Sequence, residues 1–151
     1  MREFASFGAG VQSSAIALLA LNRDARRLAV SGGSVPERYF FADVGDEPPE
    51  VYAQLARFER MIPIQRVHRF EDKRRLQDVL CGRLESGKDT NLTWIPAFVA
   101  GKPGRASAPL QRRCTYTMKV EALDRAARAW AEVPRGCKVP VVRTWMGISL
   151  D

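Results

Sequence analysis

Short apolar segments alternate with longer segments of helical periodicity along this chain. The short ones are rich in β-branched and aromatic residues and are predicted as strands: Arg2–Ser6, Arg38–Ala42, Ile62–His68 and Val139–Ile148. The longer ones are predicted as helices: Ser13–Leu21, a segment that begins at Pro48 and Pro49, Asp72–Leu84 and Thr115–Ala131. This alternation predicts an α/β fold, with a doubly wound, mainly parallel five-stranded sheet and helices on both faces.

The spacing of apolar residues differs between the predicted helices. Ser13–Leu21 is apolar nearly all round, so we expect a buried helix packed on the sheet. The helix after Pro49 has a single stripe at i, i+4 and i+7, formed by Val51, Leu55 and Phe58.

The last predicted helix, Thr115–Ala131, has one apolar face and one charged face. The apolar face consists of Met118, Ala122, Leu123, Ala126 and Trp130. On the other face, Glu121 with Arg125 and Asp124 with Arg128 are predicted as ion pairs at i, i+4.

The length of 151 residues suits one domain with one core, and no internal repeat is present. Residues 86–111 are rich in Gly, Pro and Ser, and we expect a flexible substrate loop or lid there. The chain ends directly after a strand without a closing helix, so we expect a truncation or a lost tail.

Composition excludes several classes of protein. No segment approaches the roughly 20 apolar residues that cross a bilayer, and no secretory signal is present, so we expect a cytoplasmic protein without a membrane segment. The three cysteines form no CxxC pair, which disfavours a zinc site and rules out a four-cysteine iron–sulfur cluster within one chain. The net charge of +7 favours anionic partners such as nucleotide phosphates, tRNA or DNA, although a solvated basic surface is the alternative.

The segment Ser6–Ser14 joins the first predicted strand to the first predicted helix. Small residues at Gly8 to Gly10 let the backbone approach a phosphate, and Ser13 and Ser14 add hydroxyl donors at the helix N-terminus. The segment is neither a Walker A loop, which needs Gly-Lys-Ser/Thr, nor a Rossmann fingerprint, which needs a third glycine. A plain strand–helix turn is the alternative.

Acidic residues follow the second predicted strand. Asp43 comes at the strand end and is predicted to contact a ligand, with Gly45 in the turn. The alternative is a cluster that caps the next helix, with Asp46 or Glu47 as N-cap and Glu50 in the first turn.

Basic residues precede the last predicted helix. Arg112 and Arg113 suit bidentate binding of phosphate or sulfate, and Lys119 lies about one turn further along. A solvated basic helix start capped by Thr115 is the alternative. Cys114 is either a reactive thiol with a lowered pKa or a plain small residue.

Together these segments resemble the PP-loop (N-type) ATP pyrophosphatase superfamily. Gly8–Ser13 is similar to its signature Ser-Gly-Gly-x-Asp-Ser, with Ala9 in place of a glycine and Gln12 in place of the aspartate. The branch of phosphoadenosine phosphosulfate reductase-like proteins is similar in three further segments: Phe41–Tyr52, Gln111–Lys119 and Trp145–Asp151. The resemblance thus runs from Ser6 to the end of the chain.

The resemblance implies an adenine nucleotide α-hydrolase-like domain that binds ATP, with Mg²⁺ on its phosphates, and cleaves it to AMP and pyrophosphate to activate an acceptor. Catalytic roles are expected for Ser13, Asp43 and Lys119. Nucleotide contacts are expected from Ser6, Phe7, Gly8, Ala9, Gly10, Val11, Gln12, Ser13, Ser14, Asp43 and Gly45. Contacts to phosphate, sulfate or the acceptor are expected from Glu50, Arg112, Arg113, Cys114, Thr115 and Lys119.

Three functions stay open at this point. The acceptor of an adenylating enzyme is expected to serve sulfur transfer or nucleic-acid modification, with tRNA or DNA held by the basic surface and a homodimer left open. A nucleotide-sensing or nucleic-acid-associated module without turnover is the second reading, because Gln12 replaces the family's aspartate. Reduction of a sulfonucleotide is the third, although this chain lacks the family's C-terminal cysteine.

Overall fold

The computed structural model of this chain describes residues 1–22, 34–70, 77, 98–99, 108–109, 115–139 and 141–146. Within these residues the main sheet has four parallel strands in the order β3-β2-β1-β6. In chain order they are β1 (Arg2–Ser6), β2 (Arg38–Ala42), β3 (Ile64–Val67) and β6 (Val142–Trp145). A separate antiparallel pair consists of β4 (Phe98–Val99) and β5 (Ala108–Pro109).

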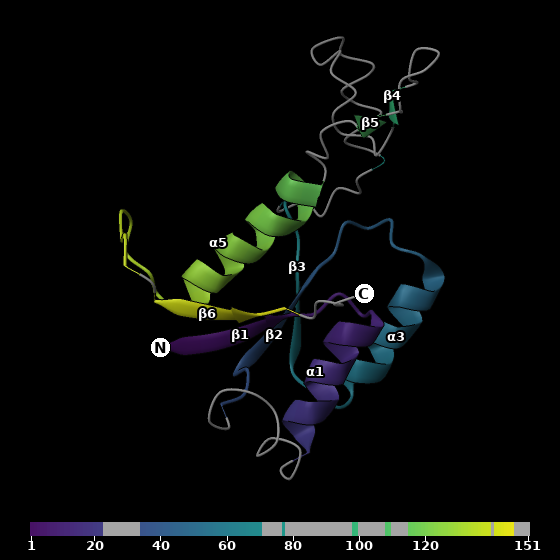
Figure 1. Cartoon of the computed structure of the whole chain (residues 1–151), viewed down its shortest axis with the longest axis horizontal. Coiled ribbons are helices and arrows are strands. Elements are labelled where there is room, and N and C mark those ends of the chain that lie inside the picture. Colours follow the sequence, from purple (N-terminus) through teal and green to yellow (C-terminus); the bar gives the residue numbers. More distant parts are fainter. Residues whose placement is uncertain are drawn as a thin grey trace.

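The helices lie on both faces of the main sheet (Figure 1). They are α1 (Val11–Leu21), α3 (Pro49–Glu59), the π-helical segment η2 (Thr115–Val120) and α5 (Glu121–Trp130), which continues directly from η2. The α/β class and the parallel sheet are therefore confirmed. A fifth strand of this sheet is not among the described residues, and most of the predicted helix Asp72–Leu84 and of the predicted lid 86–111 lies outside them. None of the described helices is both long and apolar enough to span a bilayer.

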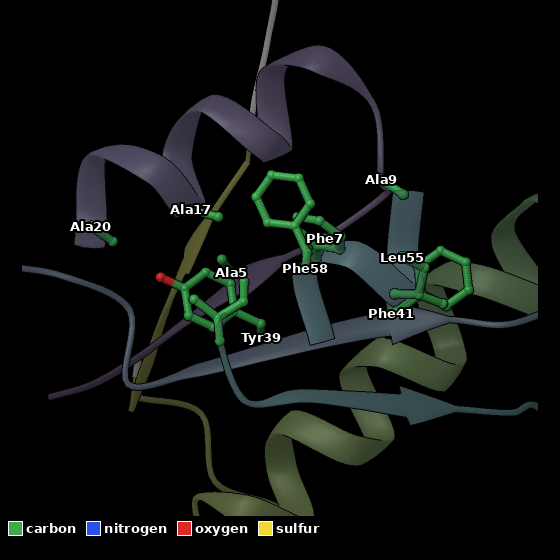
Figure 2. Packing of buried hydrophobic residues seen from close by; sticks show 10 residues of the cluster. Ala5, Phe7, Ala9, Ala17, Ala20, Tyr39, Phe41, Leu55 and Phe58 are labelled. Carbon is green, nitrogen blue, oxygen red and sulfur yellow. The ribbon is translucent and has the colours of Figure 1, made fainter. Parts of the chain in front are cut away.

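Each central strand contributes to two apolar cores because successive side chains point to opposite faces of a sheet. On β2, Tyr39 and Phe41 pack with Leu55 and Phe58 of α3 (Figure 2). Phe40 points the other way and packs in a second cluster against α5. The run of aromatic residues in β2 is thus explained by burial on both faces, as expected for a central parallel strand.

Helix α1 is not the buried helix that its sequence predicts. Its fully buried side chains are all small, at Ser14, Ala17 and Ala20, and Ile16 is half-buried against the same core, whereas Leu18 and Leu19 are 49% and 43% exposed. A helix that packs on one sheet covers only one of its own faces. Here the small residues occupy the centre of that face, and Leu18 and Leu19 lie outside it.

Helix α3 begins as predicted but is capped differently. Pro48 is the N-cap and Pro49 the first helical residue, and no side chain caps this terminus. The predicted caps make other contacts: the Asp46 carboxylate accepts a hydrogen bond from the backbone N–H of Gln77 at 2.8 Å, and Glu47 pairs with Lys119. The acidic residues of the loop before α3 therefore contact other segments of the chain instead of capping α3.

The segment η2–α5 has the predicted apolar face, with Met118 and Ala122 buried. The predicted pair of Asp124 and Arg128 is confirmed, with Arg128 Nε 2.9 Å from Asp124 Oδ2. The prediction that Glu121 pairs along the helix is wrong. Its carboxylate lies 3.0 Å from the guanidinium of Arg69, which anchors the start of α5 to the chain after β3.

Strand β6 is also held to its neighbour β1 by polar side-chain contacts. The Glu3 carboxylate on β1 accepts hydrogen bonds from Trp145 Nε1 and Arg143 NH1, both at 2.8 Å. The hydrogen bond from Trp145, together with the charge of Arg143, holds the pKa of Glu3 below its usual 4.5 although burial opposes this. Strands β1 and β6 form the floor of the cavity described below.

Candidate functional site

The loop after β1 makes a sharp turn before α1. The Phe7 N–H still donates to the Phe40 carbonyl at 2.9 Å, so the parallel ladder continues to this point. Ala9 then has φ of 54°, in the left-handed region that normally favours glycine. Glycine would adopt this backbone conformation with less strain than alanine does.

The start of α1 offers backbone donors. The first helical hydrogen bond runs from the Ser14 N–H to the Gly10 carbonyl at 3.0 Å, which leaves the N–H groups of Val11, Gln12 and Ser13 without partners inside the helix. The Ser13 hydroxyl donates to the Gly10 carbonyl at 3.1 Å, whereas the buried Ser14 hydroxyl has no partner. Such a helix start attracts anions.

The glycines keep this loop open. A Cβ built at Gly8 would meet nothing within 4 Å, and one at Gly10 would meet only Oε1 of Gln12, at 3.9 Å. Both positions therefore tolerate a side chain within the protein itself. An added side chain would instead occupy open space beside the loop.

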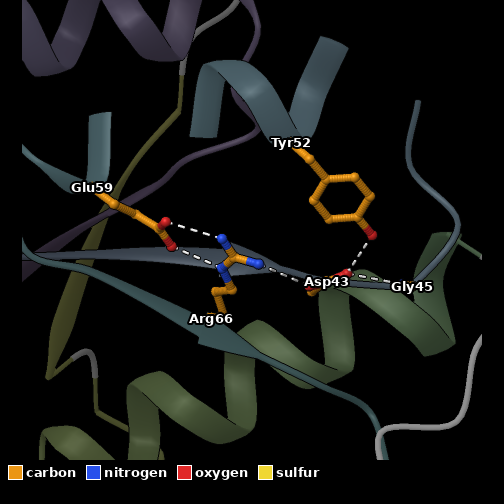
Figure 3. A network of polar contacts seen from close by, with 5 residues as sticks. All are labelled: Asp43, Gly45, Tyr52, Glu59 and Arg66. Carbon is orange, nitrogen blue, oxygen red and sulfur yellow. Dashed lines mark hydrogen bonds and ion pairs between the residues drawn. The ribbon is translucent and has the colours of Figure 1, made fainter. Parts of the chain in front are cut away.

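The turn after β2 is closed by its own contacts (Figure 3). Oδ1 of the buried Asp43 accepts hydrogen bonds from the Gly45 N–H and the Tyr52 hydroxyl, both at 2.8 Å, and Oδ2 lies 3.9 Å from Arg66. Gly45 has φ of 77°, a conformation that suits glycine. The Asp43 side chain thus orders the turn and joins it to α3 and β3.

Arg66 and Glu59 extend this network to the end of α3. The Arg66 guanidinium binds both Glu59 carboxylate oxygens, at 2.7 and 2.9 Å. This hydrogen bonding lowers the pKa of Glu59, and burial together with the hydrogen bond to Asp43 raises the pKa of Tyr52. Neither Arg66 nor Glu59 was predicted as part of a site. The charged residue Arg66 inside a predicted strand was the signal in the sequence that could have indicated this network.

A cavity of about 570 Å³ lies between α5 and the sheet. Its walls come from β1, β6 and α5, and at one end it reaches the loop after β1 through Ser6 and Gly8. Glu47 and Lys119 line the same cavity. Ligands of parallel α/β sheets bind at the carboxyl ends of the strands, which is where this end of the cavity lies.

Glu47 and Lys119 form an ion pair in the cavity wall, with Nζ 2.5 Å from Oε1. The Glu47 side chain is 15% exposed and that of Lys119 is 42% exposed, so the ammonium is the more accessible partner. An ammonium group has three donors, and Glu47 uses one of them. Lys119 therefore retains donors for an anionic ligand.

The structure brings together some of the predicted site residues and separates others. Ser6, Gly8 and Lys119 line one cavity, whereas the Asp43 side chain is engaged on the α3 side of the sheet. Glu50 is exposed in the first turn of α3 and Thr115 is the exposed first residue of η2. The predicted ligand-binding residues Arg112, Arg113 and Cys114 lie outside the described residues.

Carboxylates near the loop are already engaged. Asp43 accepts from protein donors and Glu47 pairs with Lys119. Among the residues that the structure describes, no group of three His, Cys, Asp or Glu side chains is placed to hold a metal. The described side chains thus do not form a magnesium site of their own, and Mg²⁺ stays a prediction in which phosphate oxygens and water supply most ligands.

Comparison with protein-family models, with curated proteins and with solved structures finds no match to this chain. The resemblance to PP-loop proteins therefore rests on the segments between Ser6 and Asp151 that carry it.

Proposed function

We propose that this protein binds ATP and cleaves it to AMP and pyrophosphate to activate an acceptor, as the PP-loop resemblance implies. One observation carries the proposal. The loop Gly8–Gly10 opens α1 with free N–H groups at the carboxyl end of β1, beside a cavity that contains Lys119. This combination of a helix N-terminus, an open backbone and a cation suits a polyphosphate.

In this proposal the phosphates lie over the segment Gly8–Ser14. The N–H groups of Val11 to Ser13 and the Lys119 ammonium stabilise negative charge that builds up on the leaving pyrophosphate. These donors are already oriented by the fold, so little reorganisation is needed during the reaction. Ser13 is the hydroxyl nearest the start of the helix, and Asp43 positions the neighbouring turn.

We also propose that the chain has the complete fold of the family that it resembles. The four described strands are then part of a doubly wound, five-stranded sheet of the adenine nucleotide α-hydrolase type, in a cytoplasmic protein. The predicted roles of Arg112 and Arg113 in phosphate binding belong to the same proposal, and the net charge of +7 favours tRNA or DNA as a partner of the basic surface.

A binding module without turnover is the second candidate. The observation that favours it is Gln12, which is exposed in the first turn of α1 where the family signature has an aspartate. An amide at this position cannot supply the negative charge that helps to hold a magnesium–phosphate complex.

One assay separates the candidates. The protein is incubated with ATP and Mg²⁺, and AMP with pyrophosphate is measured separately from ADP with phosphate. We expect AMP and pyrophosphate in equal amounts, with the Gly10→Val protein as the inactive control. Tight ATP binding without any product would favour the binding module, and failure to bind ATP would contradict both candidates.

A further inference from the structure

The cavity beside α5 extends far beyond the loop after β1. It follows α5, which is roughly 15 Å long for its 10 residues, and reaches Val133 and Val139 in the segment after the helix. The loop residues Ser6 and Gly8 lie at one end only. Phosphates bound over that loop would therefore leave most of the cavity free for a second ligand.

The remainder of the cavity is mainly apolar. Its floor includes Phe4 and Val142 from neighbouring strands, and its roof includes Leu123 and Ala127 from α5. The charged residues at this end, Asp124 and Arg128, also line the cavity, but they pair with each other and their side chains are more than half exposed. A phosphodiester backbone would lose its hydration along these apolar walls and would find only Arg128, already paired with Asp124, as a cation at this end, whereas an apolar body would gain from burial.

The polar end of the cavity favours an anionic head group. Lys119 is more exposed than its partner Glu47 and retains donors, and it lies at the end next to the Gly8 loop. A carboxylate that binds Lys119 would place its apolar chain along α5. Its oxygen would then face the position that the proposed function gives to the ATP phosphates.

We infer that this cavity binds a monocarboxylic acid with an apolar chain or ring, and that this acid is the acceptor. The inference rests on the proposed function for its chemical step. A carboxylate oxygen forms a bond to the α-phosphorus of ATP, and the bond from that phosphorus to the bridging oxygen breaks. Pyrophosphate leaves with the electron pair, the product is an acyl adenylate, and no proton or oxidant is required.

The test uses octanoate as the probe and 1-octanol as its uncharged analogue, in calorimetry on the whole chain without nucleotide. We expect octanoate to bind, and Thr144→Phe to weaken it at least about tenfold because the exposed Thr144 side chain lines the cavity. Gln65→Phe is the matched control, an exposed position on the opposite edge strand β3 that does not line the cavity. Lys119→Met is expected to weaken octanoate about tenfold and 1-octanol much less.

AMP binding is measured separately on the same proteins, so that the two proposals are judged independently. Octanoate that fails to bind the parent, or that binds Thr144→Phe and Gln65→Phe equally, would overturn the inference and leave nucleotide binding standing. Octanoate binding that depends on Thr144 together with no AMP or ATP binding would support the acid site and contradict the proposed function.

Discussion

The loops after β1 and β2 leave the same edge of the sheet but differ in how their polar groups are satisfied. After β1, the N–H groups that open α1 have no partners within the helix, and Gly8 and Gly10 leave space above them. After β2, the Asp43 carboxylate already accepts from Gly45 and Tyr52. The loop after β1 thus has the unpaired donors and open space of a ligand-binding loop. The contacts of the loop after β2 instead hold that turn in one conformation.

The largest effect on nucleotide binding is expected at the loop after β1. Replacing Gly10 with Val should abolish ATP and AMP binding, because the added side chain would occupy the phosphate position. The fold should survive, since φ at Gly10 is −85° and a Cβ would meet only the end of the Gln12 side chain. Calorimetry checks binding, and Ala15→Val on the exposed face of α1 is the control. Unchanged affinity in a folded Gly10→Val protein would contradict phosphate binding at the loop after β1.

At the loop after β2, a substitution is expected to lower the stability of the fold instead of weakening nucleotide binding. Asp43→Ala leaves the Tyr52 hydroxyl and the Gly45 N–H without their acceptor, which should lower the free energy of unfolding by about 2–3 kcal/mol. Denaturant titration measures this. Asp124→Ala, which breaks an exposed pair, should cost about 0.5 kcal/mol or less. If Asp43→Ala is as stable as the parent but binds no nucleotide, Asp43 is a ligand residue after all.

A third effect is expected at Lys119, which lines the cavity beside the loop after β1. Lys119→Met should weaken ATP by about 1.5–3 kcal/mol, as expected for a charged hydrogen bond, and uncharged adenosine much less. Lys138→Met is the control, because Lys138 is exposed and does not line the cavity. Equal losses for ATP and adenosine would show that Lys119 acts through the fold, by way of its pair with Glu47.

The stability of the fold is expected to depend on pH through the contact between Tyr52 and Asp43. Burial and the hydrogen bond to Asp43 raise the pKa of Tyr52 above 10.0. The native state therefore holds this proton more tightly than the unfolded state does, so the contribution to stability is complete below pH 10 and is lost as the pH rises toward the native pKa. Tyr52→Phe should cost about 1 kcal/mol at neutral pH and remove that alkaline loss, whereas the exposed Tyr116→Phe should retain it. Identical alkaline melting curves for the parent and Tyr52→Phe would contradict this assignment.

The smallest effect is expected at Ala9. Ala9→Gly relieves the left-handed backbone but adds flexibility to the unfolded chain, so stability should change by less than about 1 kcal/mol. The same change at Ala15, in the middle of α1, should cost about 1 kcal/mol. Thermal unfolding compares the two, and a large loss at Ala9 would show that its methyl group matters more than its conformation.

The elements of the sheet were predictable because their signal is local. The aromatic run of β2 and the i, i+4, i+7 stripe of α3 depend only on neighbouring residues, and both were confirmed. The exposure of Leu18 and Leu19 was not predictable, since it depends on which single face of α1 meets the sheet. Hydrophobicity alone does not distinguish a helix covered on all sides from one covered on one side.

The contacts of the candidate site depend on distant residues, which explains what the sequence missed. Glu47 meets Lys119, and Glu121 meets Arg69, only because the fold brings separate segments together. The ligand contact of Asp43 stays a prediction, but the sequence did not indicate that this side chain points toward Tyr52 and α3. The direction of that side chain depends on strand register, which a single sequence does not fix.

The most direct test of nucleotide binding at the loop after β1 is an amide chemical-shift titration of the labelled protein with ATP. We expect the N–H groups of Val11, Gln12 and Ser13 to shift most, because they gain phosphate acceptors. The N–H of Gly45, which is already bonded to Asp43, should shift much less. Saturable shifts centred on Gly45 with none at Val11 to Ser13, or no shifts at any amide, would contradict nucleotide binding at the loop after β1.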